Sequence, residues 1–262
     1  MGYRGYRRYV AVGDSQTEGL NDGDETTGYR GWADRLAEAL AAQEPGFTYA
    51  NLAVRGRRAA GVRAEQTAPA LALAPDLVTV MAGMNDLVRP GYDAAATAAE
   101  LDAMLAAFTD SGATAVTFTF PDVSSLAPLV RHLRPRVLDF NDRLRTMADR
   151  RGAVLVDTFP YPVTTDPRLW SADRIHAAPL GHARIAAATA HALGVPGSDG
   201  SWADPLPPLP ALEPWRRAGA EAAWAAAFLG PWLLRRLRGR SSGDGRSAKR
   251  PGLLPLPADG GR

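Results

Sequence analysis

The chain has 262 residues, of which 46% are hydrophobic and 22% charged, so it can form one substantial globular domain with an appendage. It contains no cysteine and only four histidines, which excludes disulfides, thiolate metal sites and a cysteine nucleophile and argues against a transition-metal site. Its net charge of +2 is too balanced for nucleic acid to be the main partner.

Residues 1–8 have no apolar signal region, and no later apolar stretch reaches transmembrane length, so we expect a cytoplasmic protein. Residues 9–12 predict a buried strand that runs into the glycine-bounded turn Gly13-Asp14-Ser15-Gln16-Thr17-Glu18-Gly19. Ser15 could be a nucleophile, could form a phosphate cradle with Thr17 and Gly19, or could only cap the next helix. The turn alone leaves these three interpretations open.

Strands and helices then alternate. The pattern predicts further strands over residues 47–52, 76–81, 113–120 and 153–157, and helices over residues 32–40, 62–73, 94–110, 137–148 and 180–193. Such alternation implies a parallel sheet with helices on both faces. The predicted fold class is therefore α/β, a flavodoxin-like three-layer α/β/α sandwich with a five-stranded parallel sheet. The irregular stretches 123–135 and 160–171 have the length of substrate-shaping loops.

The composition changes after Gly194. We predict a domain over residues 1–196, a proline-rich linker over 197–212, a helical arm over 213–240 with a break at Gly230-Pro231, and a disordered tail over 241–262. The arm carries Trp215 and Trp224 and ends in an arginine cluster, the ingredients of an interfacial membrane helix. Its alanine-rich first half offers little apolar area for lipid, so we favour docking on the domain, with weak peripheral membrane contact as the alternative.

Residues that could take part in catalysis follow four of the predicted strands. Ser15 follows the first, Gly56 the second and Asn85 the third, whereas Asp173 and His176 follow the fifth, three residues apart. Acyl transfer needs a nucleophile, a base, a group that orients the base, and donors for the oxyanion. Because parallel strands end at one edge of the sheet, these residues can converge there to supply each part.

The same residues carry a family resemblance. The chain resembles the SGNH (GDSL-type) hydrolases over roughly residues 9–193 in four blocks, Gly13-Asp14-Ser15, Gly56, Gly83-Met84-Asn85-Asp86 and Asp173-Arg174-Ile175-His176. The resemblance implies an esterase or lipase-like acylhydrolase that works without a cofactor. It implies that Ser15 is the nucleophile, His176 the base and Asp173 its orienting residue. The oxyanion hole would then consist of the Ser15 N–H, Gly56 and Asn85.

The predicted function is therefore hydrolysis of small-molecule carboxylic esters through an acyl-enzyme. The alternative from another class is a non-hydrolytic flavin- or phosphate-binding module, which explains neither Asn85 nor the Asp173/His176 pair. We expect Arg55, Arg57 and Arg58 to be solvated, and His132, His182 and His191 to lie at the surface or in helix packing. The sequence predicts neither the natural ester nor the oligomeric state.

Overall fold

A computed structural model describes residues 2–210, 213–231 and 242–256. Its centre is a six-stranded sheet in the order β7-β6-β5-β1-β4-β8, in which all strands but β8 run parallel. The parallel strands are β1 (Arg8–Gly13), β4 (Thr48–Asn51), β5 (Leu77–Met81), β6 (Thr114–Phe118) and β7 (Val154–Val156). The five predicted strands are therefore present, in the order typical of a flavodoxin-like sheet.

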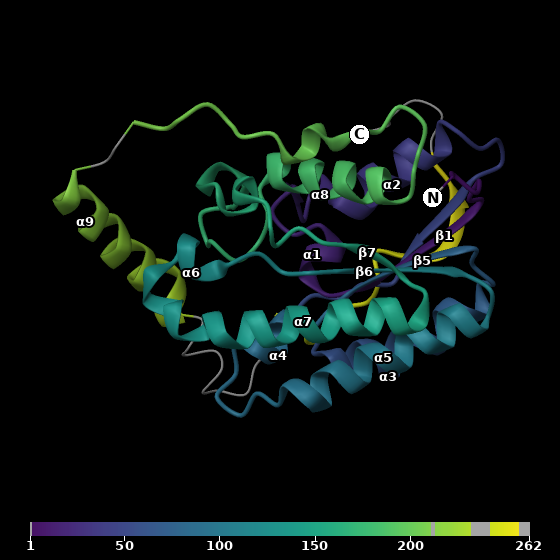
Figure 1. Ribbon diagram of the computed structural model, residues 1–262, viewed down its shortest axis with the longest axis horizontal. Coiled ribbons are helices and arrows are strands. Elements are labelled where there is room, and N and C mark those ends of the chain that lie inside the picture. Colours follow the sequence, from purple (N-terminus) through teal and green to yellow (C-terminus); the bar gives the residue numbers. More distant parts are fainter. Residues whose placement is uncertain (1, 211–212, 232–241, 257–262) are drawn as a thin grey trace.

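Helices cover both faces of the sheet, as the three-layer prediction requires (Figure 1). On one face α2 (Trp32–Ala41) packs against α8 (Pro179–Ala192), and the other face is covered by α3 (Ala59–Ala72), α5 (Ala94–Asp110) and α7 (Arg134–Arg151). The shorter elements are α1 (Ser15–Glu18), β2 (Gly23–Asp24), β3 (Gly28–Tyr29), α4 (Met84–Leu87), α6 (Val123–Leu126), η1 (Pro128–Leu133), η2 (Pro162–Thr165), η3 (Pro167–Leu169) and η4 (Gly200–Ala203).

Local sequence signals account for the central elements. Every residue of β5 is buried, because this strand has neighbours on both sides and helices on both faces. The helix α5 begins after Asp93, whose Oδ1 accepts the Ala96 N–H at 3.0 Å. It ends at Asp110, two residues before Gly112, which has a left-handed φ of +89°. The helix predicted over residues 94–110 is thus confirmed at both ends.

The sixth strand corrects the prediction of a disordered tail for residues 250–255, whereas residue 241 and residues 257–262 of that tail lie outside the described residues. Residues of β8 (Arg250–Pro255) pair antiparallel with β4, so that the parallel part of the sheet ends in an antiparallel edge strand. Lys249 pairs with Asp34 at 2.6 Å, and Arg250 Nε donates to the Tyr49 carbonyl at 2.8 Å. The two prolines of β8 are compatible with an edge strand, which leaves one row of backbone groups unpaired. The composition of these residues suggested disorder because it does not reveal their partner strand β4, which lies about 200 residues earlier in the chain.

The arm is helical from Pro214, as α9 (Pro214–Trp224), and continues as the π-helical turn η5 (Ala225–Leu229). The chain is still helical at Gly230 and Pro231, so the predicted break does not occur within the described residues, which end there at residue 231. In the π turn the Gly230 N–H donates to the carbonyl of Ala225, five residues back, a shift that accommodates a proline, which has no N–H. The arginine cluster at 235–240 lies outside the described residues.

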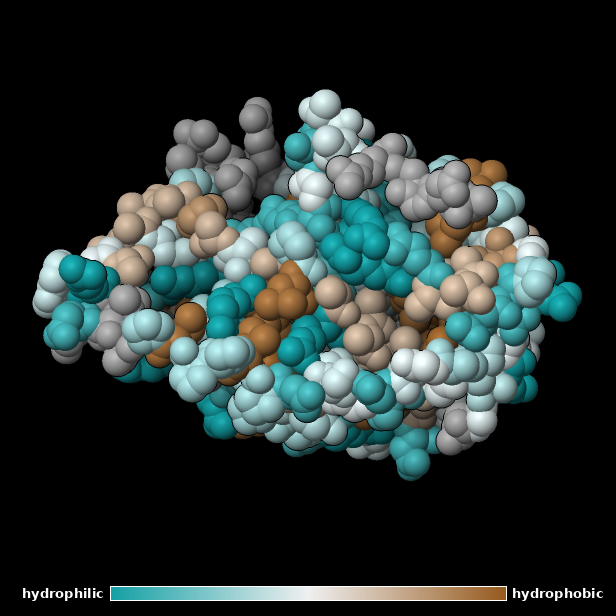
Figure 2. Space-filling view, turned by 90° about the horizontal axis from the view of Figure 1, so that it is seen from above, coloured by the Kyte–Doolittle hydropathy of each residue, from teal (hydrophilic) through white to brown (hydrophobic). Residues whose placement is uncertain are grey.

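The described part of the arm contacts the domain through one of its two tryptophans. Trp224 is buried, whereas Trp215 is 69% exposed. At the end of the molecule where α9 lies, hydrophilic and hydrophobic residues stand side by side on the surface (Figure 2). Within the described residues, no helix has both the length and the apolar character needed to cross a bilayer. The domain limits drawn from the sequence stay predictions.

Candidate active site

Ser15 lies at the turn between β1 and α1. β1 is flanked by β4 and β5, the point at which the order of strands reverses in the sheet. The turn requires Gly13, since a Cβ there would lie 2.4 Å from the Met81 carbonyl oxygen and the residue has a φ of +155°. Asp14 caps α1 by accepting the Gln16 N–H at 3.2 Å. Ser15 is thus held at the carboxyl end of the central strand, where ligands of such sheets bind.

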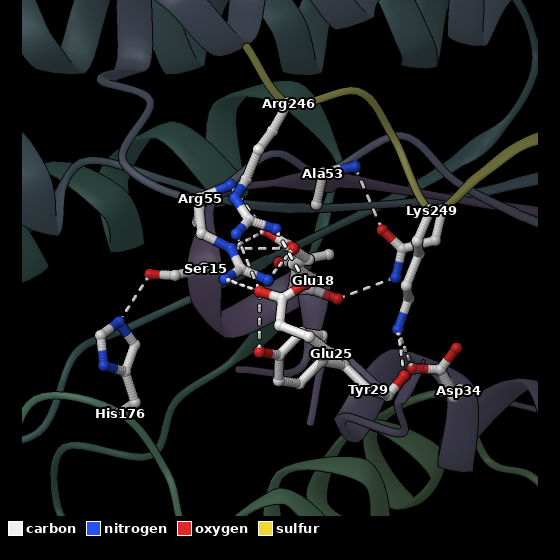
Figure 3. Close-up of polar contacts among 12 residues, drawn as sticks. Ser15, Glu18, Glu25, Tyr29, Asp34, Ala53, Arg55, His176, Arg246 and Lys249 are labelled. Atoms are coloured by element: carbon white, nitrogen blue, oxygen red, sulfur yellow. Dashed lines mark hydrogen bonds and ion pairs between the residues drawn. The ribbon is translucent and has the colours of Figure 1, made fainter. Parts of the chain in front are cut away.

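The structure brings Ser15, His176 and Asp173 into one hydrogen-bonded chain. His176 Nε2 lies 2.8 Å from Ser15 Oγ, and His176 Nδ1 lies 2.7 Å from Asp173 Oδ2 (Figure 3 shows the first contact). With its proton on Nδ1 donated to the carboxylate, the imidazole leaves the Nε2 lone pair free to accept the Ser15 proton. The arrangement can therefore draw a proton from Ser15.

Asp173 is held by four further hydrogen bonds. Its Oδ1 accepts from the N–H groups of Ile175 and His176 at 2.9 and 3.0 Å and from Ser171 Oγ at 2.7 Å, and its Oδ2 accepts from Asn21 at 3.0 Å. Burial alone would raise the pKa of Asp173, but the hydrogen bonds from the His176 ring, the His176 backbone N–H and Ser171 lower it below the ordinary range. The carboxylate therefore stays ionised at neutral pH and fixes the tautomer of His176.

Asn85 joins the Ser15 turn to the loop that carries Gly56. Its side-chain nitrogen donates to Asp14 Oδ2 at 3.0 Å and to the Arg57 carbonyl at 3.1 Å, so both amide protons have acceptors within the protein. Gly56, next to Arg57, has a left-handed φ of +76° in the turn between β4 and α3. Asn85 and the Gly56 loop are thus linked at the same edge of the sheet as Ser15.

Asp14 is buried directly beneath this arrangement. Burial raises its pKa to about 6, although hydrogen bonds from Gln16 and Asn85 and the charge of His176 act in the opposite direction. The residue therefore braces two segments at once, because it caps α1 and holds the side-chain amide of Asn85.

Gln16 is a site residue that the sequence analysis missed. Its side-chain nitrogen donates to the Ile175 carbonyl at 3.1 Å, and its side-chain oxygen accepts the Ala177 N–H at 3.1 Å. Gln16 therefore binds the backbone on both sides of His176 and ties the loop that carries His176 to the turn that carries Ser15. Its partners lie about 160 residues away in sequence, and only the polar character of the residue after Ser15 could have indicated them.

Arg55 corrects the prediction of a solvated cation. It is buried, and its Nε and backbone N–H donate to the Glu18 carboxylate at 2.9 and 2.8 Å, while Nη1 pairs with Glu25 at 3.0 Å (Figure 3). Arg246 from the C-terminal segment also reaches Glu25, at 2.8 Å. Because Glu18 ends α1 and Arg55 precedes Gly56, the pair fixes the Gly56 loop against the helix of Ser15.

His182 is part of the scaffold of the site and lies fully buried. Its Nδ1 accepts the Trp32 N–H at 3.1 Å and its Nε2 donates to the Leu20 carbonyl at 3.1 Å, so it links α8, α2 and the loop after α1. Burial lowers its pKa to about 4, which keeps the ring neutral. Among the described residues, no group of three or more His, Asp or Glu side chains is placed to hold a metal ion.

Solved structures share this fold. An α/β hydrolase enzyme from the metagenome of Lake Arreo, LAE5, is 23% identical, and the match covers 74% of this chain and 97% of the other, with a TM-score of 0.61. Axe2, an acetylxylan esterase from Geobacillus stearothermophilus, is 18% identical. The match covers 74% of this chain and 95% of Axe2, with a TM-score of 0.61. For TesA the identity is 25%, the match covers 71% of this chain and 98% of the other, and the TM-score is 0.59.

No curated protein sequence matches the chain. The model of the GDSL-like Lipase/Acylhydrolase family, however, matches residues 11–184, well over half of the chain. This span begins within β1 and ends within α8, so it includes the Ser15 turn and the loop of Asp173 and His176. The chain is therefore an ester-cleaving hydrolase that belongs to the GDSL-like lipase/acylhydrolase family.

Proposed function

We propose that the chain hydrolyses carboxylic esters with Ser15 as nucleophile, His176 as base and Asp173 as the residue that orients the base. Ser15 Oγ attacks the ester carbonyl carbon while its proton passes to His176 Nε2. The tetrahedral intermediate collapses, the C–O bond to the alcohol breaks, and His176 returns the proton to the leaving oxygen. Water, deprotonated by His176, then releases the acid from the acyl-enzyme. The hydrogen-bonded chain from Asp173 through His176 to Ser15 is the observation that carries this proposal.

We assign the stabilisation of the oxyanion to the N–H groups of Ser15 and Gly56 and to the side-chain amide of Asn85. The bonds from Asn85 to Asp14 and Arg57 hold its nitrogen in place before substrate arrives. Because both of its protons already have acceptors, an oxyanion would share one of them. The oxyanion would compete for that proton with the Asp14 carboxylate or the Arg57 carbonyl, whereas the N–H groups of Ser15 and Gly56 are the two backbone donors of the proposed hole.

The alternative of a flavin- or phosphate-binding module has less support. A phosphate cradle would need the hydroxyl of Thr17 beside that of Ser15. Thr17 has no exposed surface, so that a phosphate could not reach it. Ser15 itself faces His176 at hydrogen-bond distance, an arrangement that a phosphate site does not require.

The proposed substrate is a small-molecule ester whose acyl and alcohol parts are selected by the segments 86–93, 123–135 and 160–171. The second and third hold α6, η1, η2 and η3, which follow the carboxyl ends of β6 and β7. The similarity to an acetylxylan esterase, at 18% identity, makes acetyl esters the first class to assay.

Labelling with a fluorophosphonate, followed by peptide mapping, tests the proposal. We expect modification of Ser15 and hydrolysis of aryl esters that depends on acyl chain length. Ser15→Ala should lose both, and His176→Ala should lose about 10⁴-fold in kcat. Ser111→Ala is the matched control, because the Ser111 hydroxyl only donates to the Phe108 carbonyl at the end of α5. A folded Ser15→Ala variant with full activity, or label on another serine, would refute the assignment.

A further inference from the structure

The arm contacts the loop that carries the proposed acid–base pair. Trp224, the last residue of α9, is buried, and its Nε1–H donates to the backbone carbonyl of Asp173 at 3.0 Å. Asp173 is the residue that orients His176, three positions further along the same loop. A side chain 51 positions away in the arm therefore fixes the peptide unit that follows Asp173.

Arg174 makes the second contact between the arm and this loop. Its guanidinium lies over the Trp224 ring, 5.0 Å from the ring centroid, and pairs with the carboxylate of Glu221 one turn earlier in α9. The same guanidinium donates to the Leu126 carbonyl of α6 at 3.3 Å. Arg174 therefore holds α9 and α6 together against the loop.

The backbone of Arg174 shows that this loop needs external support. Its φ is +58°, in the left-handed region that residues with a Cβ disfavour. Such a conformation persists only when the surroundings hold it. Within the loop, the Asp173 carboxylate accepts the N–H groups of Ile175 and His176, and from outside Trp224 and Glu221 hold the two residues that set the turn.

The arm lies beyond the part of the chain that defines the family. The family model ends at residue 184, whereas α9 begins at residue 214. The Lake Arreo hydrolase is matched over 97% of its own length but covers only 74% of this chain. The contacts to Asp173 and Arg174 thus come from a segment outside the family match.

We propose that Trp224, Glu221 and Arg174 are positioning residues, and that α9 holds the Asp173–His176 loop in the conformation in which His176 can take the Ser15 proton. This inference rests on the proposed function. It differs from simple docking of the arm, because loss of the Trp224 N–H should slow the acylation step even where the fold remains intact. The effect should fall on kcat and not on KM, since Trp224 contacts the loop of the base and not the ester.

The test compares Trp224→Phe with the matched variant Trp215→Phe in the full-length chain. Trp215 lies on the same helix but is exposed, so its substitution should change nothing. Trp224→Phe keeps the ring under Arg174 and removes one donor, and we expect kcat and the rate of fluorophosphonate labelling to fall roughly five- to tenfold. Glu221→Gln, which keeps the size and removes the charge, should cause a smaller loss in the same direction. The downfield proton NMR signal of the His176–Asp173 hydrogen bond should broaden in Trp224→Phe but not in Trp215→Phe.

The outcomes separate the two proposals. If Trp224→Phe lowers the melting temperature but leaves kcat, the labelling rate and the NMR signal at wild-type values, the arm is only a structural support and the inference is overturned. It is overturned equally if Trp215→Phe slows the reaction as much as Trp224→Phe does. A wild-type chain that neither hydrolyses esters nor reacts with the fluorophosphonate would overturn the proposed function first, and this inference with it.

Discussion

Substitution of Gln16 by methionine should slow the enzyme without unfolding it. Methionine has nearly the length and volume of glutamine, so the change removes two hydrogen bonds and leaves no cavity. The lost bonds are those to the Ile175 carbonyl and the Ala177 N–H, both at 3.1 Å. Each is worth about 1 kcal/mol, because folding exchanges bonds to water for bonds within the protein. If both act on the position of His176, the barrier rises by about 2 kcal/mol, or roughly 30-fold in rate.

Steady-state hydrolysis of an aryl acetate measures this effect as a fall in kcat with little change in KM, and the melting temperature confirms folding. Gln43→Met is the matched control, because Gln43 is exposed in the turn after α2. A folded Gln16→Met variant with kcat within about twofold of the wild type would refute the reasoning, since the loop of His176 would then be held without Gln16.

Two further predictions concern other residues of the site. Asn85→Ala should lower kcat by about 10²–10³-fold with little change in KM, because its donor is needed where charge develops, and a change in KM alone would instead assign Asn85 to substrate binding. His182→Asn should flatten the pH dependence of stability. Burial lowers the pKa of His182 to about 4. The contribution of the neutral ring to the free energy of unfolding is therefore fully present above pH ~6.5. It falls by about 3 kcal/mol as the pH drops toward 4. The melting temperatures of the wild type and the variant, measured between pH 4 and 7, should converge as the pH falls. A constant difference between them would contradict this prediction.

The local elements of the fold could be predicted from the sequence because their signals are local. The helix of residues 94–110 was found at both ends, since the apolar spacing and the stop at Gly112 lie within one stretch of chain. The strand of residues 76–81 was found because burial on both faces leaves a continuous apolar run. The placement of Ser15, Asn85 and His176 at one edge also follows from the sequence, since parallel strands all end on the same side of their sheet.

Contacts between distant segments could not be predicted in this way. Arg55 looked like a solvated cation, and only the fold brings it against Glu18, 37 residues earlier, where a buried carboxylate compensates its charge. Gln16 looked like a turn residue, and only the fold lays the loop of His176 across it.

The C-terminal segments show the same limit most clearly. Residues 250–255 have the composition of a disordered tail, and they form a strand because β4 leaves an unpaired edge beside them. Trp224 lies in a helix for which the sequence favoured docking but named no partner, and the carbonyl of Asp173 gives its indole that partner. Periodicity and turn chemistry are properties of neighbouring residues, so the sequence determined the elements and their order. Burial, pairing and charge compensation depend on which segments meet in space, and these only the tertiary structure decided.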